Sequence, residues 1–503
     1  MQAQLAPASS TIRSLWSGPD MNLLDRVIAS FSPRAGLRRA QARASLDAMM
    51  HYRAGSVNRR SGSVRAVSGD ADAVATVARR QISLAVRDVI RNNAIAERAV
   101  QVLVNNIVGT GIEPKLVSED TDLNYAWPAV CRYLDSTDVD ADGISTLAGI
   151  QRMAVRAMVT DGEALVVFPD PLTAKSSFQL RVLEADYLDD RLQGRALGSK
   201  NSVYDGIEYG DDGRVVAYHL YDEHPGSVVW HPDWKGLVSS RIEASRVIHL
   251  YRPDRPGQRR GVSWLAPVLD DLVALADNDE AQLMRQKIAA CFAAFWKTDK
   301  DAKATGIPSK LAPGLIQQIG SEDEVVFASP PDVTGYDDFA RIHLRRIAVG
   351  LGITYESLTG DLTSVNFSSG RLGRIDMGQN VEAWQWGLVM PVLCQPIGRE
   401  MLRSHLRDNP RSGAALRQAR IDWTPPPPVI ADPKTETQVS VMKIEAGLAS
   451  RHGEIRRLGY EPGQIDAEIV KDEETRRSLA ALKAPAVAAS EEADQQKRER
   501  ENE

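Results

Sequence analysis

Cysteine, aromatic residues and long apolar runs are all scarce in this chain of 503 residues. The three cysteines, Cys131, Cys291 and Cys394, lie far apart and are odd in number, which excludes a disulfide framework and a cysteine-rich zinc site. The longest nearly apolar run, Ile288 to Trp296, has nine residues, about half of what a membrane span needs. The first 20 residues are polar, small and interrupted by proline, so we expect no signal peptide and a cytoplasmic origin.

The usual catalytic motifs are also missing from the sequence. It contains no glycine-rich phosphate loop followed by Lys and Ser or Thr, no Gly-x-Ser-x-Gly elbow, and no metal-binding spacing among its eight histidines. Gly109-Thr110-Gly111 resembles part of a dinucleotide fingerprint, but Pro114 stands where the third glycine belongs, so we interpret it as a turn that ends a helix. We therefore predict no catalytic residue, no metal and no cofactor.

Two pairs of adjacent acids keep an enzymatic alternative open. Asp189-Asp190 and Asp270-Asp271 could in principle hold magnesium for a nuclease. Neighbouring residues on a helix point in different directions, however, and carboxylates early in a helix are normally solvated partners of its dipole. A metal-dependent nuclease is therefore the alternative function and not the leading one.

Charge is spread unevenly along the chain. The net charge of −6 argues against a protein that grips DNA mainly by neutralising phosphates. Residues 1–80 nevertheless hold 12 Arg, no Lys and 5 Asp, a net charge of +7, which leaves −13 for the remaining 423 residues. We interpret residues 1–75 as an arginine-rich, loosely ordered N-terminal arm, with docking on nucleic acid or an acidic partner as the alternative.

Helical periodicity alternates with short β-type runs in the first half of the chain. Apolar residues three and four apart predict a helix over about 72–108, and a second helical block covers roughly 146–159. Between 163 and 251, short β-type runs separated by turn signals predict a β-rich layer with antiparallel pairing, because no long helix separates the runs. These runs are 164–168, 178–183, 215–220, 228–230 and 247–251.

Long helices dominate the second half. The pattern predicts a helix from the N-cap Ser263 to about Trp296, another over 336–349, and a third over 371–407 that Pro391 and Pro396 should kink. Trp384 and Trp386 are two residues apart and cannot share one helical face, so we expect one in the core and the other in a subunit contact. The four prolines Pro425 to Pro428 predict a stiff linker, and 484–503 a disordered tail.

Five groups of short motifs occur in a fixed order between about residues 80 and 475. They are Val86–Ala94 running into Asn105–Ile112; Asp161-Gly162-Glu163 with Leu183–Asp186; Arg260–Leu269; Gly350–Asp361 continuing to Asn366–Arg371; and Trp423–Pro426 with Ala431–Glu436 and Glu445–Ser450. Together they resemble the lambda-like family of phage portal proteins. Departures are small: Ala94 stands where the family usually has Pro, and Phe367 where it often has Tyr. Residues 1–75 match poorly.

The resemblance implies the fold class and the parts of the chain. It implies an α+β, portal-type subunit with long stem helices, a β-rich wing layer, a small clip and a helical C-terminal crown, assembling as a ring of typically twelve copies. The parts carried over are the wing at 76–263, the first stem helix at 264–297, the clip at 298–334, the second stem helix at 335–353, the tunnel loop at 354–370, the kinked helix and wing return at 371–424, and the proline linker and crown helices at 425–483.

The resemblance also implies partners and a location. The partners are double-stranded DNA, which slides through without sequence preference, further copies of the chain, the terminase large subunit, major capsid or scaffold proteins, and head-completion or tail adaptor proteins. The protein would be made in the host bacterial cytoplasm and placed in the virion at the capsid portal vertex, with no membrane contact. It would have no catalytic activity, since ATP hydrolysis belongs to terminase. Another virion structural protein, a minor capsid or tail component, is a further alternative.

The candidate DNA-contacting residues lie at the tip of the predicted tunnel loop. Duplex DNA presents one charge per about 1.7 Å of axis, so a cationic tunnel with many phosphate contacts would hold it in place. A polar, uncharged tip on an acidic body would let DNA slide, whereas the plain alternative is a surface linker between two helices. The candidate residues are Thr363, Ser364, Asn366, Phe367, Ser368 and Ser369.

Overall fold

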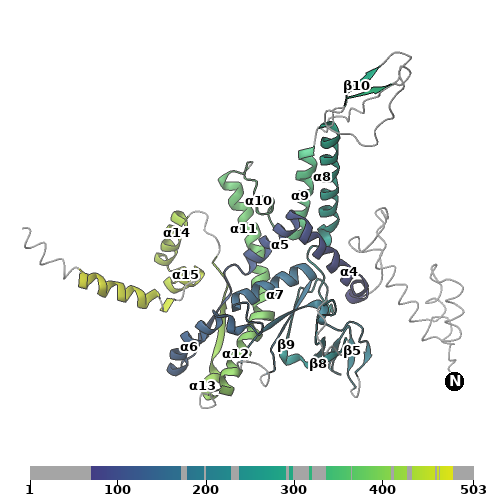
Figure 1. Cartoon of the computed structure of the whole chain (residues 1–503). Coiled ribbons are helices and arrows are strands. Elements are labelled where there is room, and N and C mark those ends of the chain that lie inside the picture. The colour runs from purple at the N-terminus through teal and green to yellow at the C-terminus, as the bar shows by residue number, and fades with distance from the viewer. Residues whose placement is uncertain are drawn as a thin grey trace, which may run out of the picture. The chain divides into compact units, whose positions relative to one another are not determined.

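The computed structural model describes most of the chain beyond the N-terminal arm (Figure 1). Most of the predicted arm, most of the predicted clip and the whole predicted tail lie outside the described residues. None of the helices within the described ranges combines the length and apolarity that a bilayer crossing requires. The described ranges are 70–170, 178–196, 200–227, 237–290, 294–297, 316–319, 336–363, 365–408, 413–427, 433–458, 462–463 and 465–479.

The chain folds into two compact units. Unit 1 comprises residues 1–107, 140–142 and 152–393, and unit 2 comprises 108–139, 143–151 and 394–503. Both helices and sheets are present, and three of the four sheets formed by the described residues are antiparallel. The predicted mixed class of helices with mainly antiparallel sheets is therefore confirmed.

The first helical region of unit 1 is broken once. The prediction of one helix over 72–108 was right about its extent but wrong about its continuity, because α4 (Ala71–Asn92) and α5 (Ala94–Ile107) are separate helices. Asn93 lies between them, and its side-chain oxygen accepts a hydrogen bond of 3.2 Å from the backbone N–H of Ala96. This is the contact of an N-cap, which marks the start of α5.

Two antiparallel sheets form the β-rich part of unit 1. The central strand of the smaller sheet, β2 (Glu163–Val167), is buried along its whole length between β3 (Arg181–Glu184) and β9 (Val247–Tyr251). The predicted antiparallel pairing is confirmed, while the predicted run 228–230 lies outside the described residues. The larger sheet has the order β4 (Gly194–Arg195), β5 (Ser202–Tyr204), β6 (Ile207–Tyr209), β7 (Val215–Tyr221) and β8 (Ser239–Glu243).

A hydrophobic cluster joins the two sheets. Leu165 of β2 packs in one cluster with Ile207 of β6 and Leu220 of β7, all almost fully buried. Each such side chain contributes about 1.5–3 kcal/mol of burial, so the cluster fixes the smaller sheet against the larger one. Short 3₁₀ turns connect the elements, namely η2 (Thr137–Val139), η3 (Ala185–Tyr187), η4 (Ala244–Arg246) and η5 (Ala266–Val268).

A helical hairpin within unit 1 is formed by α8 (Leu269–Ala290) and α9 (Tyr336–Leu351), which lie side by side (Figure 1). Beyond α8, the strand β10 (Ala294–Lys297) pairs in parallel with β11 (Ile316–Ile319). The predicted extension of the first helix to about Trp296 is therefore wrong. Short apolar runs with aromatic residues fit a strand as well as a helix, and here the strand is formed.

The predicted polar loop over 354–370 is shorter than expected. A short helix, α10 (Tyr355–Thr359), occupies its first part, and α11 (Phe367–Trp384) begins before its end. Gly360, with φ of +73°, ends α10 in the left-handed conformation that glycine adopts without strain. The non-helical stretch is thus confined to residues 360–366, so part of the expected loop belongs to helices.

The helix after the loop changes its winding where a kink was predicted. A π-helical stretch, η6 (Gln385–Cys394), separates α11 from α12 (Gln395–Asp408) and contains Pro391, whose missing N–H prevents a regular α-helical hydrogen bond. The buried amide of Gln385 donates a hydrogen bond of 2.8 Å to the carbonyl of Ile107, the last residue of α5. The π-helical stretch thus begins at a residue, Gln385, whose side chain caps the C-terminal end of α5.

The two tryptophans of this region have different environments. Trp384 packs against Trp264, with 5.1 Å between ring centroids, whereas Trp386 is 60% exposed. Trp384 is half-buried against the buried Trp264, so the expectation that one of them lies in the core is confirmed only in part. A subunit contact by Trp386 stays a prediction.

Unit 2 is built around a strand pair that the sequence pattern did not indicate. The strand β1 (Glu113–Val117) pairs antiparallel with β12 (Arg420–Thr424), although the two are far apart in the chain. Residues 465–479 are helical, as expected for the C-terminal region. The helices of this unit with assigned bounds are α6 (Thr121–Leu134), the first part of α7 (Leu147–Asp161), α13 (Gly413–Gln418), α14 (Pro433–Glu445) and α15 (Arg451–Arg457).

Candidate functional site

The backbone segments that lead into β2 and into the hairpin cross at a pair of glycines. Gly162 has φ of +97°, and a Cβ atom added to it would lie 2.3 Å from the carbonyl carbon of Val262. A Cβ on Gly261 would lie only 1.9 Å from the carbonyl oxygen of Gly162. Because both obstacles are backbone atoms, no side chain can rotate away, and each position requires glycine. Two of the quoted motifs, Asp161-Gly162-Glu163 and Arg260–Leu269, therefore meet in space.

The same crossing closes the end of α7. The Ser263 hydroxyl and the Trp264 N–H both donate to the carbonyl of Val159, at 3.2 and 3.1 Å. Ser263 was predicted to cap the long helix that follows, but its hydroxyl oxygen instead accepts the N–H of Leu265 at 3.2 Å, in the turn before α8. The hairpin thus starts from a segment that is hydrogen-bonded to a buried helix end.

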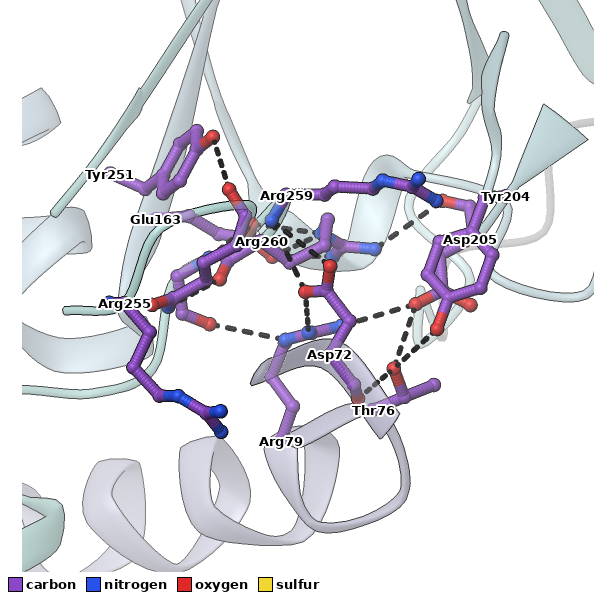
Figure 2. Close-up of polar contacts among 12 residues, drawn as sticks. Asp72, Thr76, Arg79, Glu163, Tyr204, Asp205, Tyr251, Arg255, Arg259 and Arg260 are labelled. Carbon is purple, nitrogen blue, oxygen red and sulfur yellow. Dashed lines mark hydrogen bonds and ion pairs between the residues drawn. The ribbon is translucent and has the colours of Figure 1, made fainter. Parts of the chain in front are cut away.

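A buried ion pair is formed by the sequence neighbours of the two glycines, because Glu163 follows Gly162 and Arg260 precedes Gly261 (Figure 2). The Nε atom of Arg260 lies 2.8 Å from each carboxylate oxygen of Glu163, and a second guanidinium nitrogen also donates to that carboxylate. The Nε2 atom of His249 lies 2.9 Å from Glu163, and the N–H of Gly261 donates to the same carboxylate at 3.1 Å. Every lone-pair direction of this carboxylate thus faces a polar partner, which is what a buried charge requires.

Further charged residues connect this pair to α4 (Figure 2). Arg79 on α4 donates from Nε to the carbonyl of Gly261 at 3.1 Å and lies 3.4 Å from Asp205. The carboxylate of Asp72 accepts the backbone N–H of Arg259 at 3.1 and 3.2 Å. The cluster therefore ties α4, the sheets and the segment that enters α8 into one polar network.

The pKa values of the cluster follow from burial and from its positive charges. Burial alone would raise the pKa of Glu163, but the charge of Arg260 and the hydrogen bonds of His249 and Arg260 hold that pKa well below its usual value of 4.5. Burial lowers the pKa of His249 below 6.5, and the charges of Arg260 and Arg79 add to this against the opposing effect of Glu163. At neutral pH the cluster therefore holds an ionised Glu163 and a neutral His249.

Acidification should destabilise the protein through these two groups. Below pH 6.5 the unfolded chain binds a proton at His249 that the folded chain does not, and near pH 4.5 the same holds for Glu163, so stability falls as pH falls. Asp161, whose pKa burial raises to about 6, acts in the opposite direction over the same range, so the contribution of His249 has to be taken as a difference between two proteins. We expect the free energy of unfolding of the wild type, relative to that of His249→Gln, to decrease by about 1 kcal/mol or more between pH 7 and pH 5. Urea denaturation of both proteins at several pH values would measure this difference. An identical slope in the variant would contradict the assignment.

One group of candidate metal ligands occurs among the described residues. Ligand atoms of Glu184, Asp186 and His224 all lie within 4.8 Å of one another. The guanidinium of Arg87, however, lies 3.3 Å from Glu184 and 2.5 Å from Asp186, and it also makes a bidentate pair with Asp161 at 2.7 and 2.9 Å. Arg87 therefore already supplies the positive charge that two neighbouring carboxylates attract, and no cofactor is assigned to this group.

The acid pairs considered for a nuclease have protein partners. The carboxylate of Asp189 accepts hydrogen bonds from Tyr221 at 2.6 Å and Ser239 at 2.7 Å. That of Asp271 lies 3.1 Å from His343 and 3.2 Å from Arg346. In each pair one acid is thus used to join two elements of the fold, and the geometry does not favour a metal shared by adjacent acids.

The Asp271 contacts belong to the hairpin itself. His343 and Arg346 both lie on α9, so these contacts join the first turn of α8 to the last turns of α9. Further along, the Tyr336 hydroxyl donates to Asp279. At the base, a Cβ atom on Gly350 would lie 2.4 Å from a methyl carbon of Val268, so α9 closely approaches the turn η5 that precedes α8. The hairpin is therefore fixed by polar contacts along its inner side.

The predicted tunnel-loop residues lie on both sides of the start of α11. Asn366 is the N-cap: its side-chain oxygen accepts the N–H of Ser369 at 2.8 Å, and the Ser369 hydroxyl accepts the N–H of Asn366 at 3.1 Å. This reciprocal capping box was missed because its third residue is Ser and not the usual Glu or Gln. Ser368 is exposed in the first helical turn, whereas Ser364 and the side chain of Phe367 lie outside the described residues.

The exposed hydroxyl of Thr363 has a charged neighbour. It donates to Asp361 at 2.6 Å, and the Thr363 N–H donates to the same carboxylate at 3.0 Å. These hydrogen bonds hold the pKa of the Asp361 carboxyl below its usual value, so this group is ionised at neutral pH. The described loop is thus polar as expected, with a negative charge beside its uncharged tip.

Glu163 and Arg260 both occur in the motifs described above, but the sequence did not predict that they are in contact. Arg79 and His249 were not among the predicted site residues. A usable signal was present, because a charged residue at the start of an apolar β-run, such as Glu163, needs a buried partner if the strand is central. The arrangement as a whole defines a structural subunit, in which buried charges pair with one another and hold a helical hairpin in place.

The chain belongs to the lambda family of phage portal proteins, because the model of that family matches residues 57–385. Similar curated proteins include the probable portal protein of Halomonas phage phiHAP-1, 25% identical over 409 residues that cover 76% of this chain and 77% of the relative. Portal protein B of Escherichia phage lambda is 23% identical over 461 residues, covering 80% of this chain and 85% of the relative. The family is structural and non-enzymatic, and this assignment replaces the nuclease alternative.

Solved structures give a coarser comparison. A chain from the neck of a native gene transfer agent (GTA) particle is 15% identical with a TM-score of 0.39, covering 80% of this chain and 97% of that chain. A chain from the virion of a native gene transfer agent particle is 14% identical with a TM-score of 0.40, covering 83% and 99%. At these scores the likeness adds nothing to the assignment made from the family.

Proposed function

We propose that this portal protein forms a ring at one capsid vertex and that double-stranded DNA is packaged and ejected through the ring. The observation that carries the proposal is the family match, which runs without a break from the wing region through the hairpin and the polar segment before α11. In this proposal α8 and α9 are stem helices, residues 298–334 are the clip, and 76–263 the wing. Terminase, and later the head-completion or tail adaptor proteins, dock on the clip.

The polar segment at residues 360–370 is proposed to meet DNA in the channel. Thr363, Asn366, Ser368 and Ser369 are all exposed, and the nearby charge of Asp361 is negative. Hydroxyl and amide groups beside a carboxylate offer DNA phosphates no strong electrostatic attraction. Such a surface supports sliding, and it requires no sequence recognition.

The ring itself can be tested by negative-stain imaging of the purified full-length chain. We expect ring-shaped particles with a central hole, typically of twelve copies. Compact monomers, filaments or sheets under all conditions that support assembly would contradict the proposal. The family assignment does not depend on this outcome, because it rests on the sequence match.

Positive charge in the polar segment should impair DNA movement. With Asn366→Lys and Ser368→Lys in every copy, the channel gains phosphate contacts, and we expect about a tenfold or larger loss of packaged DNA while rings still assemble. In vitro packaging into procapsids with terminase measures the effect.

A matched variant separates this charge effect from loss of the helix cap. Asn366→Ala with Ser368→Ala removes the same N-cap, at a cost of about 1 kcal/mol, but adds no charge. We expect it to package DNA nearly as well as the wild type. Normal packaging by the lysine variant would mean that this segment does not meet DNA.

A further inference from the structure

Each helix of the hairpin also has an outer side, directed away from the contacts that join the two helices. On α8, positions three or four residues apart recur on the side opposite Asp271 and Asp279, which contact α9. These outer positions are all exposed, and three of the first four are acidic. We call them the acidic face, and they are Asp270, Val273, Asp277, Glu280 and Met284.

The outer side of α9 has acids only in its first turn, at Asp337 and Asp338, and carries arginine further along. Arg341 and Arg345 are exposed on the side away from His343, which contacts α8, and the exposed Ile342 lies beside them. Asp338 precedes them in the first helical turn, where an acid is a favourable partner of the helix dipole. The guanidinium of Arg345 lies 5.7 Å from the ring centre of Tyr355. We call Arg341 and Arg345 the arginine face.

The register of the hairpin places the start of the acidic face at the level of the arginine face, and Asp277 and Glu280 lie about one and two turns further along α8. Asp271 pairs with His343 and Arg346, and Asp279 pairs with Tyr336, so the helices run antiparallel. Counting from these contacts, Asp270 is level with Arg345, and Arg341 is level with the residues just after Val273. The faces nevertheless lie on opposite sides of the hairpin, so they cannot meet within one copy of the chain.

We propose that the acidic face of one copy docks on the arginine face of the next copy. The proposal rests on the proposed ring, and it names the surfaces that join its subunits. Contact between two different faces is heterologous, so each added copy again presents one exposed face to the next copy. The series closes into a ring when the rotation between copies permits. Two charged faces in contact also make assembly sensitive to salt, since screening shortens the reach of charges from about 10 Å at 0.1 M to about 3 Å at 1 M.

Charge reversal in the full-length chain tests this pairing. One variant carries Asp270→Lys and Glu280→Lys, and a second carries Arg341→Glu and Arg345→Glu. Each variant alone places like charges opposite each other at positions 270 and 345, and the second substitution of each adds charge of the same sign nearby. We therefore expect at least about tenfold less ring by native mass spectrometry and negative-stain imaging. An equimolar mixture of the two restores opposite charges at every contact, so we expect it to form alternating rings.

A control variant carries the same change in charge on other surfaces. Asp88→Lys on α4 and Asp211→Lys on the turn between β6 and β7 also replace two exposed acids, and we expect wild-type rings. Circular dichroism of every variant establishes that it is folded. Rings formed by either reversal variant alone, or a mixture that stays dissociated, would overturn the proposed pairing and leave the ring intact.

Two further outcomes are also decisive. If the lysine variant forms normal rings that now retain DNA, the acidic face lines the channel, and the pairing is wrong. If the wild-type chain itself forms no ring, the proposed function fails, and the pairing fails with it.

Discussion

Replacing Arg260 by Ala should lower the free energy of unfolding by about 3–5 kcal/mol. Arg260 provides the bidentate partner of the fully buried Glu163, and its removal leaves a carboxylate without its compensating charge. In the wild type His249 supplies no compensating charge at neutral pH, because burial holds its pKa below 6.5. The cost therefore comes mainly from the charge left behind, and only in part from the lost contact.

The measurement is urea denaturation followed by circular dichroism, at one protein concentration for all variants because assembly shifts apparent stability. Arg214→Ala is a matched control: its side chain is 88% exposed, and it should change stability by less than about 0.5 kcal/mol. A second variant, Glu163→Leu with Arg260→Leu, removes both charges and should cost less than the single change. A loss below about 1 kcal/mol for Arg260→Ala would contradict the described pairing.

Replacing Gly261 by Ala should have an effect of similar size for a different reason. The added methyl group would lie 1.9 Å from the carbonyl oxygen of Gly162, and because that obstacle is backbone, the two segments have to separate. Overpacking that forces backbone shifts costs about 1–3 kcal/mol and occasionally more, and we expect the upper end here. The start of the hairpin would be displaced by the same movement.

The matched control is Gly378→Ala in α11, where an added Cβ meets nothing within 4 Å. Because Ala is favoured over Gly inside a helix by about 1 kcal/mol, this variant should be slightly more stable than the wild type. The two substitutions are chemically identical, so opposite signs of the stability change would establish that the crossing causes the loss. Equal and small effects would exclude a close backbone approach at Gly261.

Elements with a repeated local pattern could be predicted from the sequence. In these elements apolar residues recur at the spacing that places them on the buried side of a helix or strand. They are the helical region over 72–108, the helix near 146–159 and the strands at 163–167, 215–221 and 247–251. The break at Asn93 was not expected, because Asn is compatible with a helix interior at a small cost and its capping role depends on the direction of the next helix.

Contacts between residues far apart in the chain could not be predicted in the same way. The pairing of β1 with β12 and the ion pair of Glu163 with Arg260 both join segments separated by many residues, and no local pattern encodes the partner. The capping box at Asn366 was local but used an uncommon third residue. The motif order identified the family correctly, since it does not depend on knowing any of these contacts.

The close approach of Gly350 to Val268 has a consequence for how such a protein can change over time. Within unit 1, the chain enters the hairpin and leaves it at adjacent points, so the residues between Val268 and Gly350 form a closed excursion. Doubling the length of such an excursion costs only about 0.6 kcal/mol of closure entropy. We therefore expect insertions and deletions between the two helices to leave the spacing of the buried charges at the start of the hairpin unaltered, so that the length of this segment can vary independently of its base.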